Sequence, residues 1–345
     1  MHRTLLLVVG FLGFGLPMLV RADEPAAIPA ATTEQVQQTI ERSILYTQTE
    51  SAAWLSTRRC AACHHVPLVL WSLGEAQRQG YAIDKKFLAD TAESSLGSHE
   101  KMIKAGLFDD PAAPPDPRPS AKGVKIGTAF VAAAARTLPA LEVGQKQSVQ
   151  FIADEIVKKQ RDDGSWEFFL SRPPINENET TDGVWLIMAL QGADASESHR
   201  AAAEKATSWL AATPPVTLQD KAFRVMLAAR AGKPRAEMQP AIDELLSLQR
   251  ADGGWAQLAD WDSDAYATGE LLYVLALAGY TADAPEIKRG IDFLVATQKE
   301  DGSWTMKSRS TPDGSPGSSK LLTPINCAAA SWATLGLARL VPKGA

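Results

Sequence analysis

Two cysteines and a histidine stand close together near the start of the chain, in the run Arg59-Cys60-Ala61-Ala62-Cys63-His64-His65. In the spacing C-x-x-C-H, two thiols can bond to the vinyl groups of a haem while the adjacent histidine ligates its iron. The run therefore predicts covalent attachment of haem c through Cys60 and Cys63, with His64 as an iron ligand. A disulfide between the cysteines and part of a zinc site are the alternatives that the same residues allow.

A second set of candidate residues is acidic. Aspartates recur at every second position in Asp260-Trp261-Asp262-Ser263-Asp264, directly before an apolar, helix-forming segment. A carboxyl group that burial keeps neutral can donate a proton, which makes Asp262 and Asp264 candidate acids. An aspartate at this place can also cap the helix that follows, and Asp182 has the same position before an earlier helix.

The N-terminus has the features of an export signal. Arg3 provides a basic start, residues 5–20 are apolar, and small residues at 20–22 form a cleavage site. We expect residues 1–22 to be a signal peptide, residues 23–33 to be a flexible N-terminus, and the protein to be periplasmic or extracellular. The apolar run is short and interrupted by glycine, so no stable membrane span is expected. Haem c is normally attached outside the cytoplasm, which agrees with export.

The charge of the chain limits its partners. The formal net charge is −5 over 345 residues, which argues against nucleic acid or anionic lipid as a partner. Cys327, the third cysteine, has no motif around it and is expected to be a small buried hydrophobe.

The elements that position these residues are marked by a sequence that occurs three times. Each copy has the form Q-x-x-x-G-x-W, with an aspartate before the glycine, at residues 160–166, 249–255 and 298–304. The glutamine ends a helix, the Asp-Gly pair forms a turn with positive φ at the glycine, and the tryptophan can fold back over the turn. We interpret these glutamines and tryptophans as structural clamps.

Apolar residues at helical spacing predict twelve helices and no strand. They pair into six helical hairpins, which would make residues 34–342 a single all-α domain, a closed α6/α6 toroid. The expected outer helices cover residues 34–57, 84–105, 143–160, 197–211, 235–250 and 286–299. The expected inner helices, which are richer in alanine and apolar residues, cover 65–80, 122–138, 181–192, 218–232, 264–280 and 323–341.

With its three Q-x-x-x-G-x-W repeats, the sequence resembles the squalene-hopene cyclase and protein prenyltransferase superfamily. In that superfamily such repeats tie the helices of an α/α toroid together. The resemblance implies that C-x-x-C-H occupies the turn of the first hairpin, on the rim where later hairpins have their Gly-x-Trp turns. Met306 on one side, and Met102 or His99 on the other, are then candidates for a sixth iron ligand.

The resemblance also implies a different chemistry. Class II cyclases of this superfamily protonate an alkene with an aspartic acid of a D-x-D-D motif at the start of an inner helix. Asp262 and Asp264 lie at the corresponding place, although the adjacent pair is absent. Such cyclases have two toroid domains and an aromatic lining, whereas this chain offers one ring and 7% aromatic residues. Prenyltransferases need a zinc trio of Asp, Cys and His, and Cys327 has no matching histidine motif nearby.

These observations favour an exported haem c protein that works in electron transfer or redox chemistry with a redox partner protein. A terpenoid-cyclase-like enzyme that uses Asp262 or Asp264 as proton donor is the first alternative. The second is a non-catalytic toroid whose cavity binds a lipid, a peptide or another hydrophobic small molecule.

Overall fold

The computed structural model of the chain describes residues 28–58, 66–105, 126–167, 173–175, 177–309 and 319–344. These residues form twelve α-helices and no strand. Helices of the outer ring are α1 (Thr33–Arg58), α3 (Lys85–Lys104), α5 (Val143–Lys158), α7 (Glu197–Ala212), α9 (Arg235–Ser247) and α11 (Pro285–Thr297). Helices of the inner ring are α2 (Val66–Arg78), α4 (Ile126–Ala135), α6 (Glu179–Leu190), α8 (Leu218–Arg230), α10 (Ala265–Leu277) and α12 (Ser319–Leu340).

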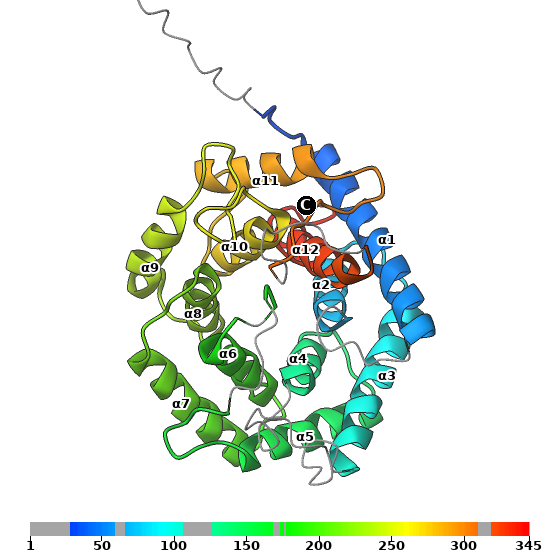
Figure 1. Ribbon diagram of the computed structural model, residues 1–345, viewed down its shortest axis with the longest axis vertical. Coiled ribbons are helices and arrows are strands. Elements are labelled where there is room, and N and C mark those ends of the chain that lie inside the picture. The colour runs from blue at the N-terminus through cyan, green and yellow to red at the C-terminus, as the bar shows by residue number, and fades with distance from the viewer. Residues whose placement is uncertain are drawn as a thin grey trace, which may run out of the picture.

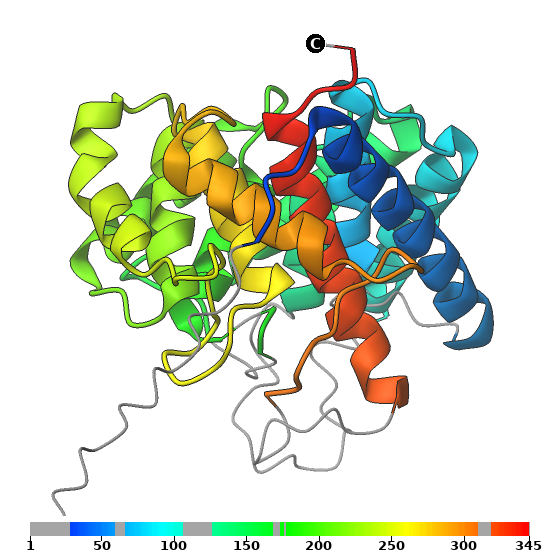
Figure 2. The ribbon, with the colours of Figure 1, turned by 90° about the horizontal axis from the view of Figure 1, so that it is seen from above.

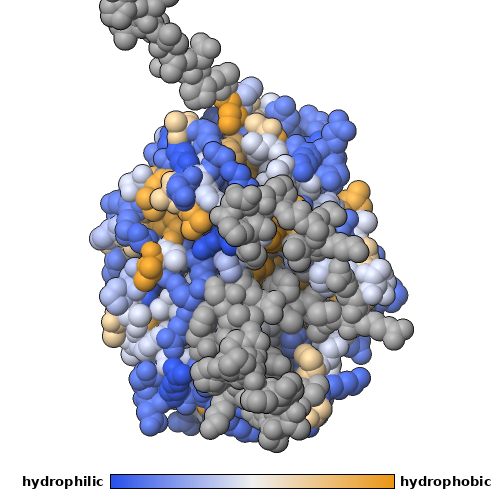
Figure 3. Space-filling view, in the orientation of Figure 1, coloured by the Kyte–Doolittle hydropathy of each residue, from blue (hydrophilic) through white to orange (hydrophobic). Residues whose placement is uncertain are grey.

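The hairpins form two concentric rings, with the even-numbered helices inside (Figure 1). The inner helix α12 packs on both α10 and α2, and α1 packs on α11 and α12, so the last hairpin meets the first. The predicted all-α class and the closed α6/α6 toroid are therefore confirmed. In the space-filling view the periphery of the ring is mostly hydrophilic, as expected for the solvent side of the outer helices (Figure 3).

All inner helices run in the same direction, because each one follows an outer helix through a turn. Their N-terminal ends therefore lie at one end of the ring and their C-terminal ends at the other. Figure 2 shows α12 crossing the ring from one end to the other. Side chains that are far apart in the sequence are thus brought together at each end.

The repeated turns clamp neighbouring hairpins together, as the sequence predicts. In each turn the tryptophan Nε1 donates to a carbonyl ten residues earlier, in the outer helix, at 2.8, 2.8 and 3.0 Å. The glutamine Nε2 donates to the carbonyl of the turn glycine and also to a backbone carbonyl of the next outer helix. In the last repeat that helix is α1, where Thr39 accepts from Gln298 at 2.9 Å. The third clamp therefore closes the ring.

The glycines of these turns cannot be replaced without moving the backbone. Gly164, Gly253 and Gly302 have φ values of 96°, 86° and 86°. A Cβ atom at these positions would lie 2.6, 2.5 and 2.3 Å from a carbonyl oxygen of the adjacent outer helix. Both the left-handed backbone and the close approach require glycine.

Every inner helix contributes an aromatic side chain to the middle of the ring. These side chains are buried, with neighbouring ring centroids 4.1 to 6.5 Å apart. We call this set the aromatic layer: Trp71, Phe130, Trp185, Phe223, Tyr273 and Trp332. Although aromatic residues are only 7% of the chain, these six are concentrated on the inner helices, where they pack against one another.

The structure bears in different ways on the remaining sequence expectations. The predicted signal peptide, residues 1–22, lies outside the described residues, as do Cys60, Cys63 and His64. None of the helices in the described segments combines the length and the apolar character that crossing a bilayer requires. Cys327 is fully buried, as predicted, and burial raises the pKa of its thiol.

Candidate active site

Carboxyl groups gather at the end of the ring where the inner helices begin. The side chain of Asn178 caps α6, and its Nδ2 donates to Asp220 Oδ2 of α8 at 2.8 Å. The hydroxyl of Thr180 donates to Asp220 Oδ1. The backbone N–H groups of Val216 and Thr217 donate to Asp220 Oδ2 at 3.1 and 3.2 Å. Asp220 therefore links the starts of two inner helices through neutral donors.

Glu270 lies deeper in the ring, on α10. It is the only charged residue of that helix and is 2% exposed. Gln219 Nε2 of α8 donates to Glu270 Oε2 at 3.1 Å. Glu270 Oε1 has no hydrogen-bond partner among the described residues. Burial, helped by the charge of Glu177, raises the pKa of Glu270 well above its ordinary value, which favours the protonated, neutral form of its carboxyl group.

Tyr266 connects Glu270 to the aromatic layer. Both residues lie on the same face of α10, four residues apart, and Gln219 Nε2 also donates to the Tyr266 hydroxyl at 2.8 Å. The Tyr266 hydroxyl donates to the carbonyl of Pro174 at 3.0 Å, and its ring centroid is 6.2 Å from that of Trp332. Burial raises the pKa of Tyr266, so the phenol also stays neutral.

We call this end of the ring the acidic mouth, defined by Glu177, Asp220, Asp264 and Glu270. Asp264, a candidate acid from the sequence, is the N-cap of α10. Its Oδ1 accepts from the N–H of Ala267 at 2.9 Å, and its Oδ2 accepts from the backbone N–H and the Nε2 of Gln257, both at 3.2 Å. Burial raises the pKa of Asp264 to about 6. Since both oxygens are occupied by donors, the expected capping role is confirmed.

The other two aspartates differ from the sequence interpretation. The Asp262 side chain is 87% exposed and forms an ion pair with Lys307 Nζ at 2.8 Å. That hydrogen bond and charge lower the pKa of Asp262, so this residue is ionised at neutral pH and is a poor proton donor. Asp182 does not cap α6, because Asn178 does; Asp182 is buried within the first turns of the helix.

The candidate sixth ligands of a haem are not assembled into an open site. His99 is 1% exposed on α3, and its Nδ1 lies 3.0 Å from the Thr128 hydroxyl of α4. Burial lowers the pKa of His99 to about 4. Met306 is buried, and Met102 is partly buried on α3. Within the described segments, no three side chains of His, Cys, Asp or Glu form a metal-binding group.

Sequence reasoning missed Glu270, Gln219 and Tyr266 as site residues. The motif that the resemblance supplied directed attention to aspartates at the start of the helix. A signal was nonetheless present, because Glu270 is the one charge in the thirteen-residue helix AYATGELLYVLAL. A lone carboxyl group in an apolar, buried helix needs a polar partner or a function.

A comparison with known families matches residues 216–321 to the squalene-hopene cyclase C-terminal domain. This segment contains α8, α10 and α11, with both Asp264 and Glu270. A stretch of 90 residues is 37% identical to squalene–hopene cyclase of Bradyrhizobium diazoefficiens, and it covers 23% of this chain. The matched stretch spans 13% of that cyclase.

Solved structures share the toroid over nearly the whole chain. A variant of the type II terpene cyclase MstE from Scytonema, in complex with geranylgeranyl dihydroxybenzoate, has a TM-score of 0.53 at 12% identity. The alignment covers 90% of this chain and 98% of that one. An unsaturated glucuronyl hydrolase from Bacillus sp. GL1 has a TM-score of 0.57 at 12% identity, covering 88% and 96%. At this identity the likeness concerns the fold.

These matches correct the functional interpretation of the sequence. The prediction of a haem c protein that passes electrons to a redox partner is wrong, since the family model and the curated relative that match this sequence are those of squalene-hopene cyclases. The C-x-x-C-H run is a short pattern, and its spacing alone was not enough to predict haem attachment. The sequence match and the shared fold support a toroid of the squalene-hopene cyclase and prenyltransferase type.

Proposed function

We propose that this chain is a terpenoid-cyclase-like enzyme in which Glu270 protonates a carbon–carbon double bond of a hydrophobic substrate. The observation that carries the proposal is the buried carboxyl group of Glu270, which accepts a hydrogen bond from Gln219 and lies one helical turn from Tyr266, whose ring contacts the aromatic layer. Proton transfer to an alkene needs a carboxylic acid that still holds its proton at neutral pH, and the raised pKa of Glu270 supports this role.

The residues around Glu270 can stabilise both products of the proton transfer, the carboxylate and the carbocation. When the proton leaves, the new carboxylate keeps the hydrogen bond that Gln219 Nε2 donates to Oε2, which is stronger to a charged acceptor. The carbocation that forms on the substrate has the π faces of Tyr266 and Trp332 nearby, and aromatic faces attract cations. The low dielectric of the buried site also strengthens the attraction between the cation and the carboxylate.

The assignment favours Glu270 over the two aspartates that the sequence suggests. Asp262 is exposed and ionised by its pairing with Lys307. Asp264 is committed to three donors at the start of α10. The charges of Asp264 and Glu177 raise the pKa of Glu270, so we assign Asp264 a supporting role.

Size is not an objection to this function. The sequence argument against a cyclase assumed that two toroid domains are needed. This chain aligns with 98% of MstE, a type II terpene cyclase. A ring of this size is therefore compatible with a terpene cyclase.

The experiment is an assay of the purified chain with squalene and with a geranylgeranyl-bearing aromatic acid, analysed by gas chromatography and mass spectrometry. We expect a cyclic product, and we expect Glu270→Gln to lower its rate of formation at least about 100-fold, as is typical for loss of a general acid. Asp262→Asn is the matched control and should keep the rate.

Two results would contradict the proposal. If neither polyprenoid gives a cyclic product although it binds, the ring is a binding module. If the product forms normally in Glu270→Gln but disappears in folded Asp264→Asn, the proton donor is the aspartate and our assignment fails. Circular dichroism of each variant checks that the ring is intact.

A further inference from the structure

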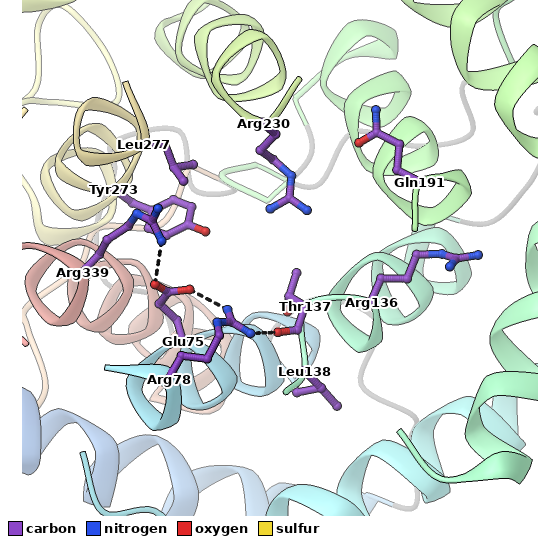
Figure 4. Close-up of a pocket in the computed structure, with 10 residues that line it drawn as sticks. All are labelled: Glu75, Arg78, Arg136, Thr137, Leu138, Gln191, Arg230, Tyr273, Leu277 and Arg339. Atoms are coloured by element: carbon purple, nitrogen blue, oxygen red, sulfur yellow. Dashed lines mark hydrogen bonds and ion pairs between the residues drawn. The ribbon is translucent and has the colours of Figure 1, made fainter. Parts of the chain in front are cut away.

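A cavity lies at the opposite end of the ring from Glu270, where the inner helices end (Figure 4). Its volume is about 540 Å³. The last turns of α2, α8 and α12 place Arg78, Arg230 and Arg339 around it. We call this end the basic mouth, defined by Glu75 and these three arginines.

Two of the arginines are held in place by a buried carboxylate. Glu75 is 1% exposed, and it accepts from Arg78 Nη2 at 2.5 Å and from Arg339 Nη1 at 3.0 Å. Burial by itself would raise the pKa of Glu75, but the hydrogen bonds and charges of the two arginines hold it below the ordinary value. Arg78 also donates to the carbonyl of Thr137. These contacts fix the two guanidinium groups at the cavity wall.

The third arginine is free. Arg230 extends from α8 into the space between Tyr273 and Thr137, and it forms no hydrogen bond or ion pair with any described residue (Figure 4). Arg136 also borders the cavity, but its Nη1 is paired with Asp194 at 2.6 Å. Arg230 is therefore the guanidinium group in this cavity that is available to a ligand.

The arrangement leaves an excess of positive charge. Three arginines and one ionised glutamate give a formal charge of +2, while Arg136 and Asp194 cancel. Basic residues are common at helix C-terminal ends, where they complement the helix dipole. That tendency explains each arginine alone, but it does not explain why three of them converge on one cavity with one left unpaired.

We propose that the basic mouth binds a doubly charged phosphoryl group, carried by a phosphate ester or a diphosphate. Guanidinium groups bind phosphoryl oxygens in a bidentate manner, and a dianion matches the charge of the cavity. The aromatic layer fills the ring between the two mouths, and its Tyr273 also borders this cavity. The ligand would therefore be held apart from Glu270, as a site additional to the proposed active site.

Isothermal titration of the full chain with pyrophosphate, inorganic phosphate and acetate tests this inference. We expect pyrophosphate and inorganic phosphate both to bind. Acetate should bind at least about tenfold more weakly, because acetate carries a single negative charge. The tighter of the two phosphorus anions identifies the ligand as a diphosphate or as a phosphate ester. We expect Arg230→Gln to weaken binding about 10- to 100-fold, the effect of losing hydrogen bonds to a charged group.

Lys101→Gln removes one positive charge from the outer helix α3 and is the matched control, with affinity expected to stay within about twofold. Arg230→Lys keeps the charge but loses the planar fork, so its affinity should be intermediate. The proposal is overturned if neither phosphorus anion binds at millimolar concentration, if acetate binds equally well, or if Arg230→Gln and Lys101→Gln have the same effect. Arg230 has no partner to lose, so the melting temperature of Arg230→Gln should be unchanged.

Discussion

Each mouth of the ring holds a buried glutamate, Glu270 in one and Glu75 in the other, and the pKa values of these two residues are shifted in opposite directions. Glu270 in the acidic mouth is 2% exposed, and Glu75 in the basic mouth is 1% exposed. Glu270 accepts from the neutral amide of Gln219, and burial raises its pKa. Glu75 accepts from Arg78 and Arg339, which lower its pKa in spite of burial. Both side chains are buried, so the opposite directions follow from their neighbours: carboxylates near Glu270 add to the effect of burial, whereas two arginines outweigh it at Glu75.

The parallel direction of the inner helices accounts for the sign of the charge at each end. Helix N-terminal ends favour carboxyl groups and helix C-terminal ends favour arginines. Because the six inner helices run parallel, carboxyl groups gather at one end of the ring and arginines at the other. The aromatic layer between them keeps the two ends chemically separate.

The largest expected effect is a loss of stability when a side chain of the aromatic layer is removed. Trp332 is fully buried and touches the rings of Trp71, Trp185 and Tyr273. We expect Trp332→Ala to lower the free energy of unfolding by about 3–5 kcal/mol, because it leaves a cavity in the layer. Urea denaturation measures this, and Trp261→Ala, on a partly exposed loop position, should cost less than about 1 kcal/mol. Equal losses in the two variants would show that the layer does not hold the ring together.

The next effect concerns pH at the acidic mouth. The raised pKa of Glu270 means that it loses its proton at a higher pH in the folded chain than in the unfolded chain, where its ordinary pKa is 4.5. Its burial therefore costs more as the pH rises above that value. Relative to the native chain, Glu270→Gln should gain up to about 1.4 kcal/mol of stability per pH unit above pH 4.5, until the folded-state pKa is reached. Urea denaturation at pH 5, 6 and 7 measures the trend, and a constant difference would contradict a neutral Glu270.

The basic mouth should respond in the opposite direction. Glu75→Gln removes the carboxylate between Arg78 and Arg339, whose side chains are 36% and 34% exposed. Solvent screens such arginines in part, so we expect a loss of about 1–3 kcal/mol at pH 7, less than for a fully buried pair. Since the pKa of Glu75 is lowered, its stabilisation is present above its ordinary value of 4.5 and is lost as the pH falls below it. A deficit that grows in acid would show that the two mouths do not differ as described.

The smallest effect separates the two aspartates at the start of α10. Asp264→Ala should cost about 0.5–2 kcal/mol, the usual price of losing an N-cap. Asp262→Ala removes an exposed ion pair with Lys307 and should change stability by less than about 0.5 kcal/mol. Thermal denaturation of the two variants makes the comparison, and the reverse order would contradict the capping role of Asp264.

Much of the fold could be predicted from the sequence. The helix ranges agree with the structure to within a few residues at most ends, because helical spacing and Asp-Gly turns mark them. The clamps were readable because Gln160, Gln249 and Gln298 each stand at the same distance from a glycine and a tryptophan. Closure of the ring was also predicted from the sequence, through the number of hairpins and the resemblance that the three repeats carry.

The site could be predicted only in part. Asp264 was found as a helix cap from its position, which is local information. Glu270 depends on Gln219 and Tyr266, and the pairing with Gln219 crosses from α10 to α8. Arg78, Arg230 and Arg339 meet only because the ring closes, and each alone resembles an ordinary basic residue at a helix end. Contacts of this kind, between helices far apart in the sequence, cannot be predicted from the spacing of residues along the chain.

The account rests most directly on the protonation state of Glu270, which infrared spectroscopy can measure. A protonated carboxyl group has a carbonyl stretching band that a carboxylate lacks. We predict this band in the purified chain at pH 7, its loss in Glu270→Gln, and its retention in the control Asp262→Asn, whose exposed side chain pairs with Lys307. If the band is absent at pH 7, or if it persists in Glu270→Gln, the acidic mouth does not hold a neutral Glu270, and the proposed proton donor is wrong.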